Sequence, residues 1–424
     1  MFEVVNMENS NSLSDVPVIA FPDEDRINNL INLFYDEYNI KPQFIVKVPG
    51  RVNIIGEHID YCGYPVLPLA LEQDILIAGN VINELELWVQ NSDKKKYNKY
   101  YTVLKTFQDV KIEPDTFGKP YWYNYVLCGI KGALEYLNND FFYGLQLFVD
   151  GNIPPASGLS SSSALVSAAC LAFLYAQNAS LNKTKIASMC AKCERYIGTE
   201  GGGMDQAIAF LAEKYCAQYI TFNPLQAQPV SLPEDAIFVV AHSIAEANKA
   251  ATNDFNKRVI ECRLAAKLLA TTRAEFQDKK ILTLNEVQNL LGQGLEEMIA
   301  LVKKVLTKHI YGKNEICDLL MITEADLNEI YLTPNTRDIT EFKLRQRALH
   351  VYEEARRVEL FRKICQTFMN LSENNSCEQN VEVVSYSNGD INKLNYLTRL
   401  GELMSESHQS LKICMNALMI IWTG

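Results

Sequence analysis

The residues best suited to carry chemistry begin with a small-residue loop, Gly151 to Ala164. An apolar run at 145–149 precedes it and predicts a buried strand, and a longer one at 165–175 follows it and predicts a buried helix. Such a loop leaves backbone N–H groups free, and the helix N-terminus carries about half a positive charge. Serine hydroxyls can donate to phosphate oxygens or ligate Mg²⁺. We expect an anion site rather than a flexible linker, because apolar elements adjoin the loop on both sides.

Two other segments place charged side chains among apolar or glycine residues. Segment 49–61 carries four of them: Arg51, Glu57, His58 and Asp60. Segment 201–205 is glycine-rich and ends in Asp205. Phosphoryl transfer needs charge neutralisation, positioning and an acceptor for the hydroxyl proton. An ionised Asp205 at a helix start could accept that proton, and the Arg51 guanidinium could pair with it and with the migrating phosphoryl group. The other three side chains suit a ligand with several hydroxyls.

These segments also have purely structural interpretations. Asp205 could be a helix N-cap residue, and Arg51 with Glu57 could form a structural ion pair. Two large kinase classes are excluded by absent motifs. The chain has no G-x-x-x-x-G-K-[ST], the P-loop motif, and no H-R-D or D-F-G set.

Composition and charge narrow the class of protein. The chain has 424 residues, of which 48% are hydrophobic, and its formal net charge is -11. An acidic chain argues against binding to nucleic acid or an acidic membrane, so an anionic ligand needs local donors. The 11 cysteines lack paired spacing, which predicts reduced thiols in the cytoplasm. Cys190-Ala-Lys-Cys193 fits buried helix positions better than a zinc site. We find no signal peptide and no membrane-spanning run, and we expect a monomer with small-molecule ligands.

The apolar pattern predicts an α+β protein of two domains, at 21–223 and 224–424. Strands at 44–48, 66–71, 75–79 and 86–90 predict one mostly antiparallel sheet in the first domain, with helices at 23–38, 122–136, 165–175 and 185–196. The second domain is predicted to open with a buried strand at 236–242, after one at 215–222 that ends the first. Helices at 249–270, across most of 283–365 and at 400–422, and a surface loop at 372–393, complete the prediction.

Segment 49–61 resembles the galactokinase signature of the GHMP small-molecule kinases, and 155–164 is similar to the phosphate loop of that superfamily. The resemblance covers about residues 25–365. It implies an N-terminal domain like domain 2 of ribosomal protein S5, a ferredoxin-like C-terminal domain, and an active site in the cleft between the halves. It also implies ATP- and Mg²⁺-dependent phosphorylation of the anomeric 1-hydroxyl of a sugar.

The resemblance further implies a role for each matching position. Arg51 and Asp205 match the catalytic pair, which also contacts the substrate. Sugar contacts are matched by Glu57, His58 and Asp60, with Gly202 and Gly203 close to the sugar. ATP contacts are matched by Trp122 near the base and by Gly158, Leu159, Ser160, Ser161, Ser162 and Ser163 near the phosphates. Ser163 also matches the metal ligand.

Within the family, the sequence resembles most the N-acetylgalactosamine kinases, over 51–78, 149–166, 191–212 and 248–270. Phe255 stands where galactokinases tend to have a sugar-contacting tyrosine, which is compatible with a bulkier 2-acetamido group. We therefore expect N-acetylgalactosamine or galactose as the acceptor. The alternatives are a galactokinase proper and a catalytically silent or truncated sugar-binding form. The Ser163-Ala164 dipeptide, which a related galactose sensor lacks, favours catalysis.

One departure from the family concerns its third glycine-rich motif, of the Leu-Thr-Gly-Ala-Gly-Trp-Gly-Gly type. After Gly312 the sequence has only Gly389, Gly401 and Gly424, and they are not clustered. We expect an incomplete, C-terminally truncated second domain, with a strand edge and apolar helix faces exposed.

Overall fold

The computed structural model describes residues 3–6, 16–19, 24–104, 106–116, 118–138, 142–179, 181–241, 250–373 and 393–416. The chain forms two compact units. Unit 1 comprises Met1–Val52, Ala70–Ala212 and His242–Phe255, and unit 2 comprises Asn53–Leu69, Glu213–Ala241 and Asn256–Gly424. Neither unit is continuous in sequence, and the expected domain limits at 21–223 and 224–424 remain predictions.

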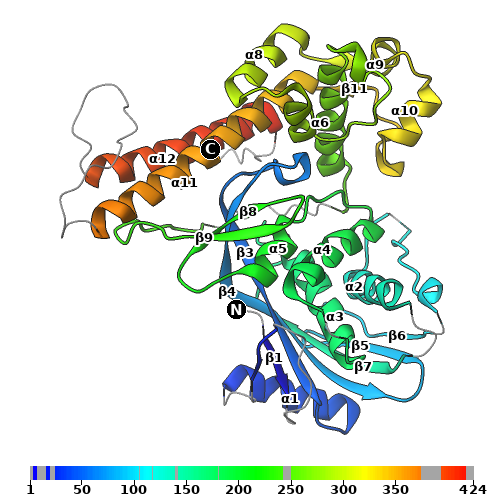
Figure 1. Cartoon of the computed structure of the whole chain (residues 1–424). Coiled ribbons are helices and arrows are strands. Elements are labelled where there is room, and N and C mark those ends of the chain that lie inside the picture. Colours follow the sequence, from blue (N-terminus) through cyan, green and yellow to red (C-terminus); the bar gives the residue numbers. More distant parts are fainter. Residues whose placement is uncertain are drawn as a thin grey trace, which may run out of the picture. The chain divides into compact units, whose positions relative to one another are not determined.

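Unit 1 is built on a seven-stranded sheet with the strand order β2-β1-β3-β4-β7-β5-β6 (Figure 1). Its strands are β1 (Glu3–Asn6), β2 (Val18–Ile19), β3 (Phe44–Ile55), β4 (Leu67–Ile82), β5 (Glu86–Asn91), β6 (Tyr100–Val103) and β7 (Gly144–Gly151). Strands β5 and β7 pair in parallel, whereas β4–β7 and β5–β6 are antiparallel. The α+β class predicted from the sequence is confirmed.

Strand β4 is one strand where the sequence predicted two. The polar break at 72–74 does not interrupt it, because the buried Asp74 is neutralised by an ion pair with Arg26 at 2.6 Å. Strand β3 likewise runs beyond the predicted 44–48 and continues through the charged segment to Ile55.

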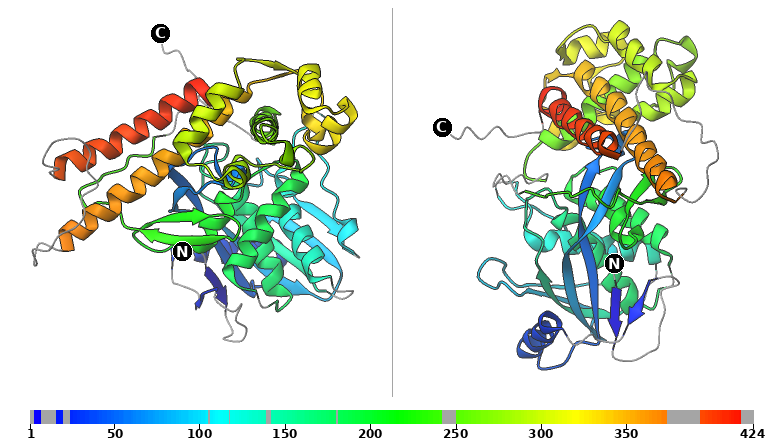
Figure 2. Two further views of the ribbon diagram at one scale, coloured as in Figure 1. Left: turned by 45° about the horizontal axis from the view of Figure 1, so that its top comes forward. Right: turned by 90° about the vertical axis from the view of Figure 1, so that its left-hand side faces the viewer.

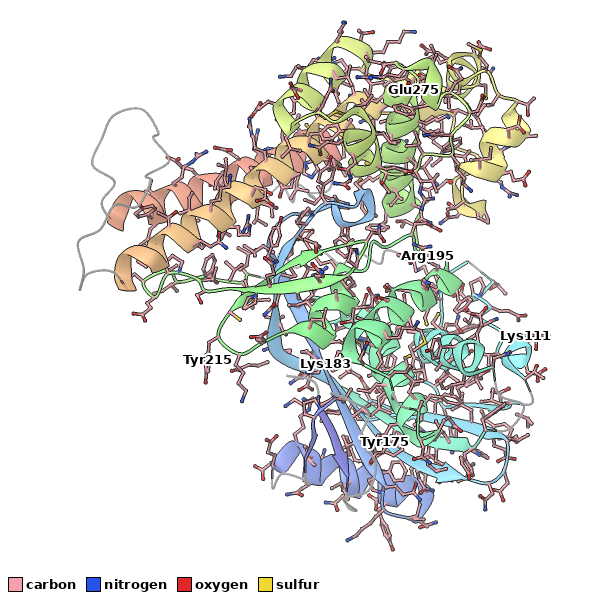
Figure 3. The ribbon with its side chains drawn as sticks, viewed as in Figure 1. Lys111, Tyr175, Lys183, Arg195, Tyr215 and Glu275 are labelled. Carbon is pink, nitrogen blue, oxygen red and sulfur yellow. The ribbon has the colours of Figure 1, made fainter. Side chains whose placement is uncertain are left out.

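Helices cover both faces of this sheet. They are α1 (Asp25–Tyr38), α2 (Trp122–Leu137), α3 (Ser161–Ala176), α4 (Lys183–Cys193) and α5 (Met204–Leu211), with a 3₁₀ turn η3 (Glu194–Ile197) after α4. On β3, Ile45 packs in one cluster with Leu30 and Phe34 of α1. The neighbouring Phe44 packs instead on Tyr175 of α3, labelled in Figure 3, with ring centroids 5.1 Å apart. Since adjacent strand residues point to opposite faces, α1 and α3 lie on opposite sides of the sheet.

Helices α2 and α3 cross at very short range. A Cβ at Gly129 would lie 2.3 Å from the Val166 carbonyl oxygen and 2.7 Å from the Cys170 amide nitrogen. Only glycine allows this approach, and the crossing fixes the helix that follows the small-residue loop.

Unit 2 is mainly helical in the part that the structure describes. Its helices are α6 (Asp254–Ala270), α7 (Leu284–Leu291), α8 (Leu295–Val305), α9 (Lys313–Leu320), α10 (Glu324–Ile330), α11 (Leu344–Glu373) and α12 (Lys393–Ser410). Its strands form two short ladders, β8 (Ala217–Thr221) with β9 (Gln226–Val230), and β10 (Tyr311–Gly312) with β11 (Glu341–Phe342). Helices α11 and α12 lie side by side (Figure 2). None of the helices described, in either unit, is long and apolar enough to cross a membrane.

The predicted strand at 236–242 is wrong over 236–241, and His242 lies outside the described residues. Residues 236–241 form no regular element, and Ile237 and Val239 are 89% and 85% exposed. A strand needs a neighbour to take its backbone hydrogen bonds, and no described strand pairs with this segment. Apolar composition alone was therefore not sufficient to predict a strand here.

The helix predicted at 400–422 starts earlier, at Lys393, and gives way to a π-helical turn at Leu411–Met415. Residues 417–424, and the predicted surface loop over 374–392, lie outside the described residues.

The helix crossing gives a stability prediction. Gly129→Ala should lower the free energy of unfolding by about 1–3 kcal/mol, because the added methyl group overpacks against backbone atoms of α3. Gly401→Ala, at an open helical site in α12, is the matched control and should gain up to about 1 kcal/mol from helix propensity. Urea denaturation followed by circular dichroism measures both, and equal effects of the two substitutions would contradict the close crossing.

Candidate active site

The small-residue loop has the predicted setting, between β7 and the N-terminus of α3. Three of its residues adopt left-handed backbone conformations, with φ of 56° at Ala156, 80° at Gly158 and 61° at Ser160. Alternating handedness of this kind turns successive N–H groups toward one concave side, which suits an anion. The Ser160 hydroxyl is buried and has no hydrogen-bond partner, so it is available to a phosphate oxygen.

Strand β3 anchors the loop from one side. The Arg51 amide donates to the Leu159 carbonyl at 3.2 Å, and the Arg51 Nη1 donates to the Gly158 carbonyl at 2.6 Å. A Cβ at Gly50 would lie 2.9 Å from the same Leu159 oxygen, so a larger residue would push the loop away. Main chain and side chain of β3 together hold the loop in place.

Arg51 and Asp205, which the sequence analysis paired, form a buried ion pair. The Arg51 Nε and Nη2 lie 2.8 and 2.7 Å from Asp205 Oδ1, and the two side chains are 6% and 11% exposed. The N-cap interpretation of Asp205 is wrong, because Gly203, with φ of 104°, occupies the N-cap of α5. Asp205 lies in the first helical turn, where the helix dipole favours its ionised form.

A second carboxylate joins this pair through Ser163. The Ser163 hydroxyl lies 3.0 and 2.9 Å from the two Glu194 oxygens and 3.1 Å from Asp205 Oδ2. Gln206 donates to Glu194 Oε2 at 2.6 Å. Sequence reasoning missed Glu194 and Gln206. Glu194 ends an ordinary helical pattern, and its exposed neighbour Arg195 is labelled in Figure 3.

This cluster fits a hard divalent cation. The Ser163 hydroxyl has one proton and lies near three carboxylate oxygens, so this corner of unit 1 is rich in oxygen atoms. Mg²⁺ prefers one or two carboxylates together with substrate phosphates. Ser163 and Glu194 supply such a set beside the loop. Among the described residues no group of three or more His, Cys, Asp or Glu side chains could hold a metal, so phosphate oxygens would have to complete the shell.

The predicted hydroxyl-binding residues belong to unit 2, where they follow β3. Gly56 and His58 have φ of 109° and 63°, and Asp60 begins the 3₁₀ turn η1 (Asp60–Cys62). The side chains of Glu57, His58 and Asp60 are all half-buried. The His58 Nδ1 lies 3.0 Å from the Tyr61 hydroxyl, and burial raises the pKa of Tyr61, so this phenol keeps its proton.

The remaining predicted contacts lie in unit 1. Gly202 and Gly203 directly precede α5, and Gly203 is buried. Trp122 starts α2, and its indole N–H donates to the Asn98 carbonyl at 2.9 Å while its ring packs on Tyr97. The proposed contact of Trp122 with a nucleotide base stays a prediction.

The unit 1 cluster can carry out acid–base and phosphoryl chemistry. It offers a buried carboxylate as proton acceptor, a guanidinium for an oxyanion, and a loop with free donors for phosphate oxygens. These groups come from β3, the loop before α3, η3 and α5.

Comparison with known proteins identifies the same segments. A family model described as "Galactokinase galactose-binding signature" matches residues 32–81. A second model, described as "GHMP kinases N terminal domain", matches residues 124–213. The two matches contain the loop, Arg51, Asp205 and Glu194.

Several galactokinases resemble the chain along most of its length. Galactokinase of Dictyostelium discoideum is 37% identical over 408 residues, which cover 94% of this chain and 79% of the relative. Galactokinase of Saccharomyces cerevisiae is 31% identical over 403 residues, which cover 84% of this chain and 75% of the relative. The crystal structure of Lactococcus lactis galactokinase complexed with galactose is similar in fold, with a TM-score of 0.61 at 21% identity, covering 93% of this chain and 81% of that one.

The charge cluster predicts strong energetic coupling between its members. Arg51→Met should cost about 3–5 kcal/mol of stability, because it removes the cation paired with the buried Asp205 carboxylate. Adding Asp205→Asn should recover part of that loss, since it removes one of those charges. Arg399, which forms an exposed ion pair with Glu402, provides the control, and Arg399→Met should cost less than about 1 kcal/mol. A double-mutant cycle by urea denaturation measures the coupling, and simple additivity of Arg51→Met and Asp205→Asn would contradict it.

Proposed function

The chain belongs to the galactokinase family, and from this membership we propose that it transfers the γ-phosphoryl group of ATP to the anomeric 1-hydroxyl of galactose. The family consists of ATP-dependent sugar kinases, so the chain is a phosphotransferase. The observation that carries the proposal is the buried Arg51–Asp205 pair, whose arginine also anchors the phosphate loop. Monomeric state and cytoplasmic location remain predictions.

In the proposed reaction, the Asp205 carboxylate accepts the proton of the sugar 1-hydroxyl. The resulting oxygen attacks the γ-phosphorus, the bond from that phosphorus to the β,γ-bridging oxygen breaks, and ADP leaves with the bond's electron pair. Arg51 holds Asp205 ionised and oriented, and its guanidinium faces the negative charge that spreads over the migrating group. The ion pair distances of 2.7 and 2.8 Å support this positioning role.

The loop holds the triphosphate in this proposal. Backbone N–H groups near Gly158 and Leu159 and the hydroxyls of Ser160, Ser161 and Ser162 donate to phosphate oxygens. Ser163 and Glu194 would hold Mg²⁺, which would neutralise charge on the phosphate oxygens. Gln206 keeps the Glu194 carboxylate oriented through its 2.6 Å hydrogen bond.

Sugar recognition is assigned to a different set of residues. We propose that Glu57, His58 and Asp60 bind the hydroxyls that do not react, and that Gly202 and Gly203 leave room for the sugar ring. Trp122 is proposed to contact the nucleotide base.

The relatives of the chain change the expected acceptor. The sequence favoured the N-acetylgalactosamine kinases, whereas the similar proteins from Dictyostelium discoideum and Saccharomyces cerevisiae are galactokinases. Galactose is therefore the proposed acceptor. Phe255, at the start of α6, remains the feature that could admit N-acetylgalactosamine.

A coupled ADP-release assay with three acceptors and one non-reacting analogue tests the proposal. We expect kcat/KM for galactose to exceed that for N-acetylgalactosamine by at least about 10-fold, because a pocket shaped for a 2-hydroxyl rejects the larger group. 1-Deoxygalactose, which lacks the accepting hydroxyl, should inhibit without being phosphorylated, and mevalonate should be inert. Preference for N-acetylgalactosamine would reverse the acceptor assignment, and galactose binding without turnover would indicate a silent sugar-binding protein.

The catalytic assignment predicts that Asp205→Asn loses about 10²- to 10⁴-fold in kcat, the range for removing a positioned base. The amide keeps the shape of the side chain and can still contact Arg51, so binding of ATP should change little. Arg51→Lys should also lower kcat, because a point charge cannot replace the forked guanidinium. Near-normal turnover by a folded Asp205→Asn enzyme would show that Asp205 is not the base.

A further inference from the structure

The turn that carries Glu57 and His58 has a left-handed backbone at two positions. Gly56 and His58 have φ of 109° and 63°, and His58 is not a glycine. Glycine adopts positive φ readily, whereas at His58 this conformation costs free energy that surrounding contacts can offset. The contacts that fix this turn therefore decide where its two side chains point.

Two buried side chains of α11 hold the turn by its backbone. Glu354 Oε1 accepts a hydrogen bond from the Gly56 amide at 2.9 Å. His350 Nε2 lies 2.8 Å from the Glu57 carbonyl oxygen. Both side chains are fully buried, with 0% exposure. The two bonds hold the peptide group before Gly56 and the peptide group after Glu57.

The chemistry of the His350 ring is defined by these partners. Burial lowers the pKa of His350, so the ring is neutral and has a single N–H. A carbonyl oxygen only accepts, so Nε2 carries the proton and donates to Glu57. The Nδ1 atom then accepts from the Ser410 hydroxyl at 2.8 Å.

Helix α12 completes the arrangement with two serines on its buried side. Ser410 fixes the His350 ring, and the Ser407 hydroxyl donates to Glu354 Oε1 at 2.7 Å. The other Glu354 oxygen accepts from Arg357 Nε, also at 2.7 Å. The serines of α12 therefore hold the two α11 side chains that bond to the turn, and the two helices lie side by side in Figure 2.

We infer that His350 and Glu354, held by Ser410 and Ser407 of α12, are positioning residues that set the Gly56–His58 turn for sugar recognition. They act through the backbone of the turn and not on the sugar itself. The inference rests on the proposed function, because it takes Glu57 and His58 as sugar contacts. Its consequence is that sugar affinity depends on the packing of α12 against α11.

Conservative changes on α12 test the inference with little risk to folding. Ser410→Ala and Ser407→Ala each remove one hydroxyl, and each should raise KM for galactose by about 3- to 10-fold, the size of one lost hydrogen bond. KM for ATP should stay within about twofold, because the phosphate loop makes none of these contacts. Ser405→Ala is the matched control, since Ser405 is exposed on the same helix and bonds only to the Gly401 carbonyl in its own helix.

His350 gives a second, stronger comparison. His350→Leu should raise KM for galactose by more than about 10-fold, and His350→Gln, whose amide can still donate to the Glu57 carbonyl, should restore part of the affinity. A merely structural role would change both KM values together and would show no such rescue. If His350→Leu does not fold, the serine variants and His350→Gln decide the question.

Amide hydrogen exchange separates this inference from the proposed function. In Ser410→Ala and Ser407→Ala, amides of 56–60 should exchange faster while those of α5 stay unchanged. If wild-type protein phosphorylates no sugar, the proposed function fails, but faster exchange would still support the positioning of the turn. If wild type is active and the variants leave both exchange and KM for galactose unchanged, the inference is overturned.

Discussion

The structure of unit 1 depends on burying two carboxylates around one serine hydroxyl. Asp205 and Glu194 both lie within 3.1 Å of Ser163, and Arg51 is the cation paired with Asp205. Buried like charges are costly unless cations and donors surround them. Arg51 donates to Asp205 and Gln206 donates to Glu194, so each carboxylate has a donor in the folded chain.

The scaffold explains how these groups come together. Strand β3 supplies Arg51 and anchors the phosphate loop, and the Gly129 crossing fixes α3 behind that loop. In unit 2, the turn after β3 has positive φ at the non-glycine residue His58, a conformation that contacts from other elements can stabilise. Two buried residues of α11 bond to this turn, so the proposed sugar recognition would depend on a helix pair that carries none of the proposed catalytic groups.

Local patterns were sufficient to predict much of the site. The sequence predicted the loop between a buried strand and an apolar helix, and the residue types of Arg51 and Asp205 suggested their pairing; that the loop binds an anion stays a prediction. Glu194 and Gln206 could not be predicted, because they lie in ordinary helical segments and gain their role only when α4 and α5 meet α3. The strand prediction at 236–241 was wrong for a related reason, since a strand forms only with a pairing partner and not from its own composition. His350 and Glu354 likewise contact residues nearly three hundred positions away.

The most direct test of the central claim identifies the atom that receives the phosphoryl group. The protein is incubated with galactose, ATP and Mg²⁺, and the product is examined by phosphorus and proton nuclear magnetic resonance. The account predicts a sugar phosphate whose phosphorus couples to the anomeric proton, formed together with ADP. A phosphate on any other carbon, or release of inorganic phosphate without a sugar product, would contradict it.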